Sequence, residues 1–353
     1  MYSNKLPPET ENVSIDMINL NLNVPESMRL AIISKMYDYA AKHEAQPFRK
    51  MGCQYVVNLL YKPEYKNKRL LFCINSNNPN RPFVQMAFNP SGLTTSDLQL
   101  LVNNIKILLG DILFNKLYSE GNVSRLDIAF DIKNIIFEDL LFNRKLQRTC
   151  GYYKSNMNGT LGSVKLGSDT SKLQLRIYSK TKKDIAKKIN TPPYPVTRIE
   201  AVVSVNQKLA NIKTIKNPFK GLGVYKQSHL YADKRLPVCI GAAIFLHGLT
   251  PLLQQMEGHE RQALEQLLTD HKIEMPPAEE VFGLWQKECD SFLELFRPPL
   301  SKVRSFSDLS PRKIAAEDVD EYLYYFHAEQ LSGRLNGNWI DYVEPYTANK
   351  IAA

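Results

Sequence analysis

The chain has 353 residues, of which 44% are hydrophobic and 23% charged, an ordinary balance for a globular protein that is large enough for more than one core. Its formal net charge of +9 favours polyanions, chiefly nucleic acid, although solubility alone would also explain such an excess. There is no run of about 18 apolar residues and no apolar signal core, so neither a membrane-spanning helix nor a secretion signal is expected.

The first 120 residues alternate between strand and helix patterns. Alternating apolar and polar residues predict a strand at 14–23, and Pro25 at a first-turn position predicts a helix over 26–43. Further short strands are expected at 55–61, 70–74 and 83–88. The start signal at Thr94 predicts one long amphipathic helix that reaches Tyr118.

The next segment is strand-rich, and beyond Pro237 the pattern becomes helical. Strands are expected at 123–132, 165–166, 173–180 and 196–205. Helical patterns follow at 182–190 (a short basic helix or loop), 252–271, 278–296 and 315–331. We therefore predict an α+β fold with a strand-rich core, an antiparallel or mixed central sheet and covering helices, plus a helical C-terminal region. The expected parts are an N-terminal domain (1–120), a catalytic domain (121–236) and the helical region (237–353).

The cysteines and histidines match no common metal or disulfide pattern. Five cysteines are scattered without a Cys-x-x-Cys pair, and six histidines form no His-x-His or His-Glu-x-x-His motif. We therefore expect reduced thiols, a cytoplasmic protein and no zinc site.

Paired acids occupy one face of the strand Arg125-Leu-Asp-Ile-Ala-Phe-Asp131. Because side chains alternate along a strand, Asp127 and Asp131 share a face with Arg125 and the small Ala129. Carboxylates placed together repel each other, so a metal ion or a basic partner is expected beside them.

Two later strands show the same separation of polar and apolar faces. In the strand 173–180, Arg176, Tyr178 and Lys180 lie opposite the apolar residues, and in the strand 197–203, Arg198 lies with Glu200. If the three strands are neighbours, these polar faces combine. The alternative is a solvated sheet face in which Asp127 pairs with Arg198, and Glu200 with Arg125, across neighbouring strands.

The order of these motifs resembles that of rolling-circle replication initiators of the Rep_trans type, which lack the His-hydrophobic-His metal motif. Their relatives include some conjugative relaxases and the filamentous-phage gene II nickases. The motifs are Ser124-Arg-Leu-Asp-Ile-Ala-Phe-Asp131, Leu175-Arg-Ile-Tyr-Ser-Lys180 and Thr197-Arg-Ile-Glu200. The turn Gly167-Ser-Asp-Thr-Ser171 resembles the Gly-Ser segment before the tyrosine strand of plasmid members, and Ile15-Asp-Met-Ile-Asn-Leu resembles the phage gene II start. The resemblance is confined mainly to residues 120–206.

The resemblance implies a nicking-closing endonuclease that starts rolling-circle replication of a plasmid or phage. Tyr178 would attack one strand of origin DNA and form a 5′-phosphotyrosine, while Lys180 and Arg176 would stabilise the phenolate and the phosphate. The implied cofactor is Mg²⁺ or Mn²⁺, held by carboxylates of Asp127, Glu200 and Asp131.

Basic residues near this strand are expected to bind DNA phosphates. They are Arg125, Arg198, Lys182, Lys183, Lys187 and Lys188. The expected partner is origin DNA, single-stranded or extruded as a hairpin, with a host helicase, the replication machinery and a second copy of the chain as further candidates and no membrane. Candidate second nucleophiles are Tyr152, Tyr153 and Tyr194, and nothing in the sequence selects one.

Three other interpretations remain open. A conjugative relaxase would use the same chemistry on a different DNA site. A metal nuclease would use water as the nucleophile and leave Tyr178 a structural role. A non-catalytic basic protein would use the sheet only as a DNA-binding surface.

Overall fold

The computed structural model describes residues 10–50, 52–65, 69–144, 149–154, 161–273 and 278–298. The predicted helix at 315–331 lies outside these ranges.

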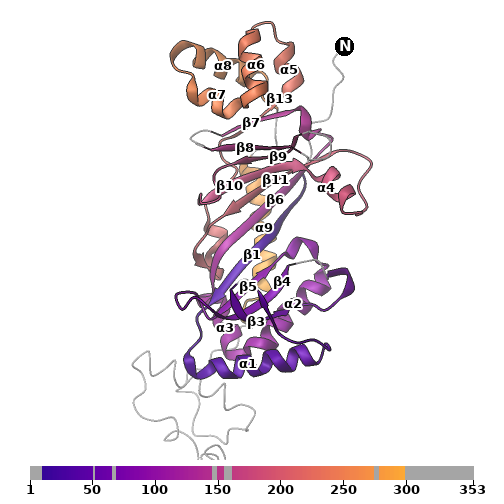
Figure 1. Ribbon diagram of the computed structural model, residues 1–353, viewed down its shortest axis with the longest axis vertical. Coiled ribbons are helices and arrows are strands. Elements are labelled where there is room, and N and C mark those ends of the chain that lie inside the picture. The colour runs from indigo at the N-terminus through magenta and orange to yellow at the C-terminus, as the bar shows by residue number, and fades with distance from the viewer. Residues whose placement is uncertain are drawn as a thin grey trace, which may run out of the picture.

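A large antiparallel sheet runs through the described part of the molecule, with the strand order β2-β3-β4-β5-β1-β6-β11-β10-β9-β8 and with β12 also paired to β6 (Figure 1). Its eleven described strands are β1 (Thr10–Leu22), β2 (Phe48–Lys50), β3 (Cys53–Asn58), β4 (Leu70–Ser76), β5 (Val84–Phe88), β6 (Asn122–Lys133), β8 (Cys150–Lys154), β9 (Leu161–Leu166), β10 (Leu173–Ser179), β11 (Val196–Val203) and β12 (Gln207–Lys208). A second pair consists of β7 (Leu140–Arg144) and β13 (Leu222–Lys226). The predicted α+β class is confirmed, and of its two sheet options the structure has the antiparallel one.

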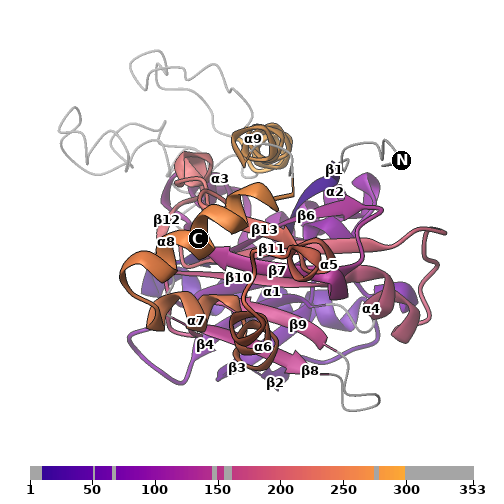
Figure 2. The ribbon, with the colours of Figure 1, turned by 90° about the horizontal axis from the view of Figure 1, so that it is seen from above.

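Helices lie at both ends of the sheet and along one side of it (Figures 1 and 2). They are α1 (Glu26–Ala41), α2 (Thr95–Leu109), α3 (Asp111–Glu120), α4 (Lys180–Ala186), α5 (Gln227–Ala232), α6 (Val238–His247), α7 (Leu249–Gln255), α8 (Gly258–Asp270) and α9 (Ala278–Glu294). Figure 1 shows α1 to α3 at the opposite end of the molecule from α5 to α8.

The predicted long helix after Thr94 is wrong in one respect, because it is divided into α2 and α3. The Thr94 hydroxyl caps the first of them by accepting a hydrogen bond from the Asp97 amide at 3.2 Å, as its start signal predicts. Gly110 then adopts a φ of 76°, a left-handed conformation that favours glycine and ends the helix. The predicted helix at 252–271 is likewise two helices, α7 and α8, and Gly258, the first residue of α8, has a φ of 60°.

The main core lies on the apolar face of the central strands, and α9 returns to cover it. Trp285 of α9 and Phe296, just after its end, are fully buried, and Phe292 of α9 packs against Phe88 of β5 with ring centroids 6.3 Å apart. Burying side chains of this size stabilises the fold by about 2–3 kcal/mol each. Because one face of these strands packs against helices, the register of the strands determines which side chains lie on the opposite face of the sheet.

A smaller core lies under α5 to α8, beside β7 and β13. It includes Leu230, Leu249, Leu253 and Leu268, which contact one another and not the main core. Among the described residues no single helix is long and apolar enough to cross a membrane. Only α6 and α7 together, bent by 119° at their junction, meet the length and composition requirements.

Candidate functional site

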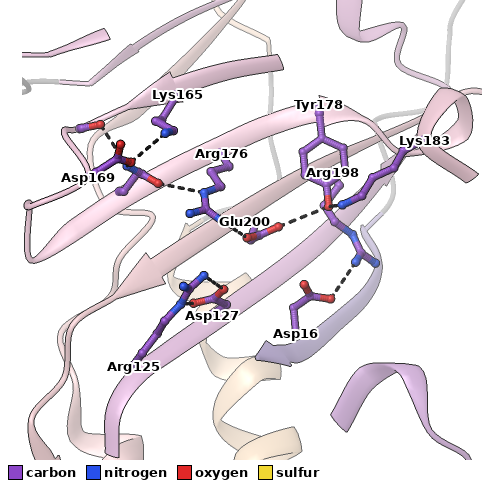
Figure 3. Close-up of polar contacts among 12 residues, drawn as sticks. Asp16, Arg125, Asp127, Lys165, Asp169, Arg176, Tyr178, Lys183, Arg198 and Glu200 are labelled. Carbon is purple, nitrogen blue, oxygen red and sulfur yellow. Dashed lines mark hydrogen bonds and ion pairs between the residues drawn. The ribbon is translucent and has the colours of Figure 1, made fainter. Parts of the chain in front are cut away.

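Three neighbouring strands bring the predicted motifs together on one face of the sheet. β11 lies between β6 and β10, and residues directly opposite each other in antiparallel strands project to the same side. One cross-strand row contains Arg176, Glu200 and Ala129, and the next contains Tyr178, Arg198 and Asp131. The expected combination of the polar faces is therefore observed (Figure 3).

The Tyr178 hydroxyl lies between a cation and an anion. It accepts a hydrogen bond from Lys183 Nζ at 2.8 Å and donates one to Glu200 Oε2 at 3.3 Å. Lys183 Nζ also lies 4.1 Å from the centroid of the Tyr178 ring, within the range of a cation–π interaction. Tyr178 is only 9% exposed, so this position on the sheet is more enclosed than the alternation of its strand suggests.

Burial and charge shift the protonation of all three groups. Burial raises the pKa of Tyr178, and the Glu200 charge raises it further, while Arg198 acts in the opposite direction. Burial also raises the pKa of Glu200, with added repulsion from Asp16 and then Asp127. Much of the Lys183 side chain is exposed, but its amino group lies against the ring, and this burial lowers the pKa of Lys183.

The second carboxylate oxygen of Glu200 is bound by an arginine, which fixes the orientation of the carboxylate. Arg176 Nη1 donates to Glu200 Oε1 at 3.2 Å, and Arg176 Nε donates to Gln174 Oε1 at 2.9 Å. The Glu200 side chain is 6% exposed, against 36% for that of Arg176. Arg176, predicted to stabilise the phosphate, is thus also the residue that orients the carboxylate beside Tyr178.

Lys180 occupies a different position from the predicted one. The prediction that places it on the tyrosine strand is wrong, because β10 ends at Ser179, whose hydroxyl accepts from the Lys182 amide and caps α4. Lys180 Nζ instead binds Asp131 Oδ2 at 2.7 Å. The cation at the Tyr178 hydroxyl is Lys183, which the sequence suggested only for DNA phosphates.

Asp131 is fully buried and surrounded by cations. Arg198 donates to both carboxylate oxygens, through Nε at 2.6 Å and Nη2 at 2.9 Å, in addition to the contact from Lys180. Burial alone would raise the pKa of Asp131, but the hydrogen bonds and charges of Arg198 and Lys180 outweigh it and lower that pKa. Asp131 therefore anchors Arg198 beside Tyr178.

Asp127 forms a bidentate pair with Arg125 of its own strand. Arg125 Nε and Nη2 donate to its two oxygens at 2.7 and 2.5 Å. Arg125 was expected at DNA phosphates, and 31% of its side chain remains exposed. The pairing differs from the sequence-based alternative, in which these groups pair between strands.

Asp16 of β1 is a site residue that sequence reasoning missed. The register between β1 and β6 shifts between Ile15 and Met17, so Asp16 is the extra residue of a β-bulge. Its Oδ1 accepts from Arg198 Nη1 at 3.2 Å and from the Ser91 hydroxyl at 3.0 Å. A bulge depends on the partner strand, so only the weak similarity of this stretch to the phage gene II start pointed to it.

The predicted metal ligands do not fit the arrangement that the structure describes. Asp127 and Asp131 are four residues apart on β6, about 13 Å along the strand, too far to contact one ion. Each acid is already paired with an arginine, and the described residues contain no group of three His, Cys, Asp or Glu side chains that could hold a metal ion. The charges of Asp16, Asp127 and Glu200 do repel one another.

The other predicted DNA-binding residues lie on or after α4. Lys182 binds Glu138 Oε1 at 2.6 Å, and Lys187 and Lys188 are exposed at the C-terminal end of the helix. Figure 1 shows α4 projecting beyond one end of the central strands. None of the α4 side chains is buried, so a partner can contact this basic segment without disrupting the packing of the core.

The chain has similarity to known proteins in structure but not in sequence. No protein-family model and no curated protein sequence matches the chain. Among solved structures, the rolling circle replication initiator protein from Geobacillus stearothermophilus is similar, with 13% identity, a TM-score of 0.34, and coverage of 57% of this chain and 78% of that chain. At this identity and TM-score the likeness by itself says nothing about activity.

Proposed function

We propose that this chain nicks and reseals single-stranded DNA by transesterification through Tyr178. The observation that carries the proposal is the position of the Tyr178 hydroxyl, which accepts from Lys183 and donates to Glu200 among further cations. An uncharged tyrosine is a poor nucleophile at neutral pH, so the group needs both a proton acceptor and a cation. The two partners of the hydroxyl supply these functions.

In the proposed step, Glu200 takes the phenolic proton while the Tyr178 oxygen attacks a phosphodiester. The O–P bond to the tyrosine forms, the P–O3′ bond breaks, and the 3′ oxygen leaves as a hydroxyl with a proton from Glu200 or solvent. A carboxylate with a raised pKa is a stronger base, which suits Glu200 for this transfer. The reverse sequence reseals the strand, because the phosphotyrosine ester retains the energy of the broken bond.

Cations of this chain would stabilise the charge that develops. Lys183 lies at the phenolic oxygen, and Arg198 is the cross-strand neighbour of Tyr178, held by Asp131. Charged donors that are in position before the reaction stabilise the transition state more strongly than water does, because they need not reorganise during the reaction.

The biological role within this chemistry follows from the three-motif resemblance. It favours a replication initiator that acts at a plasmid or phage origin, and a conjugative relaxase is the alternative with the same reaction. A requirement for Mg²⁺ or Mn²⁺ is part of the same resemblance.

The test uses a randomised pool of single-stranded DNA with constant ends, incubated with the full chain in Mg²⁺ or Mn²⁺ and then denatured. A label at the 3′ end should remain on the protein, and a label at the 5′ end should be released on a fragment with a free 3′-hydroxyl. Tyr178→Phe should abolish the adduct, while Tyr37→Phe, which removes the hydroxyl of an exposed tyrosine on α1, should not. Cleavage without any adduct would instead support water as the nucleophile, and binding without cleavage would support a passive DNA-binding surface.

A further inference from the structure

A second tyrosine of the sheet lies in the same cross-strand row as Tyr178. Tyr153 of β8 is opposite Ser163 of β9, and Ser163 is opposite Tyr178 of β10. Residues in one such row project to the same face, so Tyr153 shares the face of the candidate site. With strands about 4.8 Å apart, the two tyrosine Cα atoms are separated by about 9.5 Å.

The Tyr153 ring lies against bare backbone. A Cβ atom added to Gly151, two residues earlier on the same face, would be only 3.1 Å from Tyr153 Cε2 and 3.3 Å from its hydroxyl oxygen. The absence of a side chain at Gly151 therefore makes room for the ring along the strand. Tyr153 is 49% exposed, in contrast to the 9% of Tyr178.

The amino group of a lysine lies over this ring. Lys165, the cross-strand partner of Gly151, has its Nζ 5.3 Å from the Tyr153 ring centroid and 2.8 Å from Asp169 Oδ1. A half-exposed aromatic ring with a cation over one face leaves its other face as a stacking surface for a base, and the cation lies close enough to contact the phosphate of that nucleotide. The cross-strand row of Tyr153 leads directly to the candidate nucleophile.

We propose that Tyr153 and Lys165 form a subsite for one unpaired base of single-stranded DNA that extends from Tyr178 across β9. The inference rests on the proposed function, since it assumes that DNA is the substrate at Tyr178. A separation of about 9.5 Å corresponds to about three stacked nucleotides at 3.4 Å each, and to fewer in an extended strand. The base at Tyr153 is thus within about three nucleotides of the scissile phosphate.

The experiment compares the binding of two fluorescent strands by the full chain, in a Tyr178→Phe background that prevents covalent capture. One strand is a 20-nucleotide oligothymidine and the other is an abasic strand of equal length, so that they differ only in their bases. Tyr153→Ala should weaken oligothymidine binding by roughly 5- to 150-fold, the range for one stacked base, and leave binding of the abasic strand unchanged. Tyr153→Phe keeps the ring and should bind both strands like the parent.

Tyr37→Ala is the matched control, because Tyr37 is also 49% exposed but belongs to α1 at the far end of the molecule (Figure 1). It should leave binding of both strands unchanged. Thermal unfolding of Tyr153→Ala, expected near that of the parent, checks that the fold is intact.

The subsite is refuted by an equal loss on both strands, by no loss, or by no binding of either strand. An equal effect of Tyr153→Ala and Tyr153→Phe would also refute stacking and assign the role to the hydroxyl, as for a second nucleophile. The proposed function has a separate readout, the covalent adduct of the wild-type chain. If no adduct forms but the base-dependent loss is seen, the nicking chemistry fails and the subsite stands.

Discussion

Replacing Lys183 with methionine removes the ammonium from the Tyr178 hydroxyl and keeps an unbranched side chain of similar length. At the observed 2.8 Å, a unit charge on Lys183 and one on the phenolate attract by ~6 kcal/mol at an effective dielectric constant of about 20, and by ~1.5 kcal/mol in water. The partly exposed position of Lys183 lies between these limits. We therefore expect adduct formation to slow about 100-fold, equivalent to ~2.7 kcal/mol, as for the loss of one donor to a developing oxyanion.

The assay is single-turnover formation of the covalent adduct at pH 8 with a 3′-labelled strand. Lys182→Met is the matched control, since Lys182 is on the same helix but binds Glu138 instead of Tyr178. It should reduce strand affinity through the loss of one phosphate contact and leave the rate at saturating DNA unchanged. Lys183→Arg keeps the charge and should recover part of the rate. If Lys183→Met and Lys182→Met have equal rates at saturation, the cation at Tyr178 has no part in the reaction.

Three further predictions concern the groups around the tyrosine. Asp131→Ala leaves Arg198 buried without its bidentate partner, so the free energy of unfolding should fall by about 3–5 kcal/mol. Urea denaturation measures this change, and a decrease below about 1 kcal/mol would contradict the anchoring role. The rate of adduct formation should depend on pH as a bell-shaped curve, because Glu200 ionises with a pKa above its usual 4.5 and Lys183 loses its proton with a pKa below its usual 10.5. A rate that rises steadily to about pH 11 would exclude a role for charged Lys183. The resemblance predicts that EDTA stops adduct formation and that Mn²⁺ restores it. Because Asp127 is already paired with Arg125, Asp127→Asn should leave the Mn²⁺ dependence unchanged, and a higher Mn²⁺ requirement in that variant would instead make Asp127 a ligand.

The sequence predicted the charged face because its signal is local. Alternation along β6, β10 and β11 determines which side chains share a side, and the apolar residues of each strand determine which side is buried. The strands β8 and β13 were not predicted, since Cys150-Gly-Tyr-Tyr-Lys and Leu222-Gly-Val-Tyr-Lys are short and contain a glycine that weakens the strand signal. Without β8, Tyr153 could not be distinguished from other candidate tyrosines.

The position of Lys183 could not be predicted from alternation because the backbone changes its period immediately after Tyr178. Ser179 caps a helix, so the side chains that follow it have a period of 3.6 residues instead of two. As a result, Lys183 lies against Tyr178, while Lys180 contacts Asp131. The two partners of the hydroxyl therefore differ in rigidity: Glu200 belongs to a central strand and is held by Arg176, whereas Lys183 is carried by a helix that buries no side chain. In the proposed mechanism, this difference in rigidity suits the different roles of the two groups. The base stays fixed in the sheet, whereas the cation is carried by α4 and can shift with the phosphate that approaches Tyr178, so that its charge stays beside the phenolic oxygen while the bond to phosphorus forms.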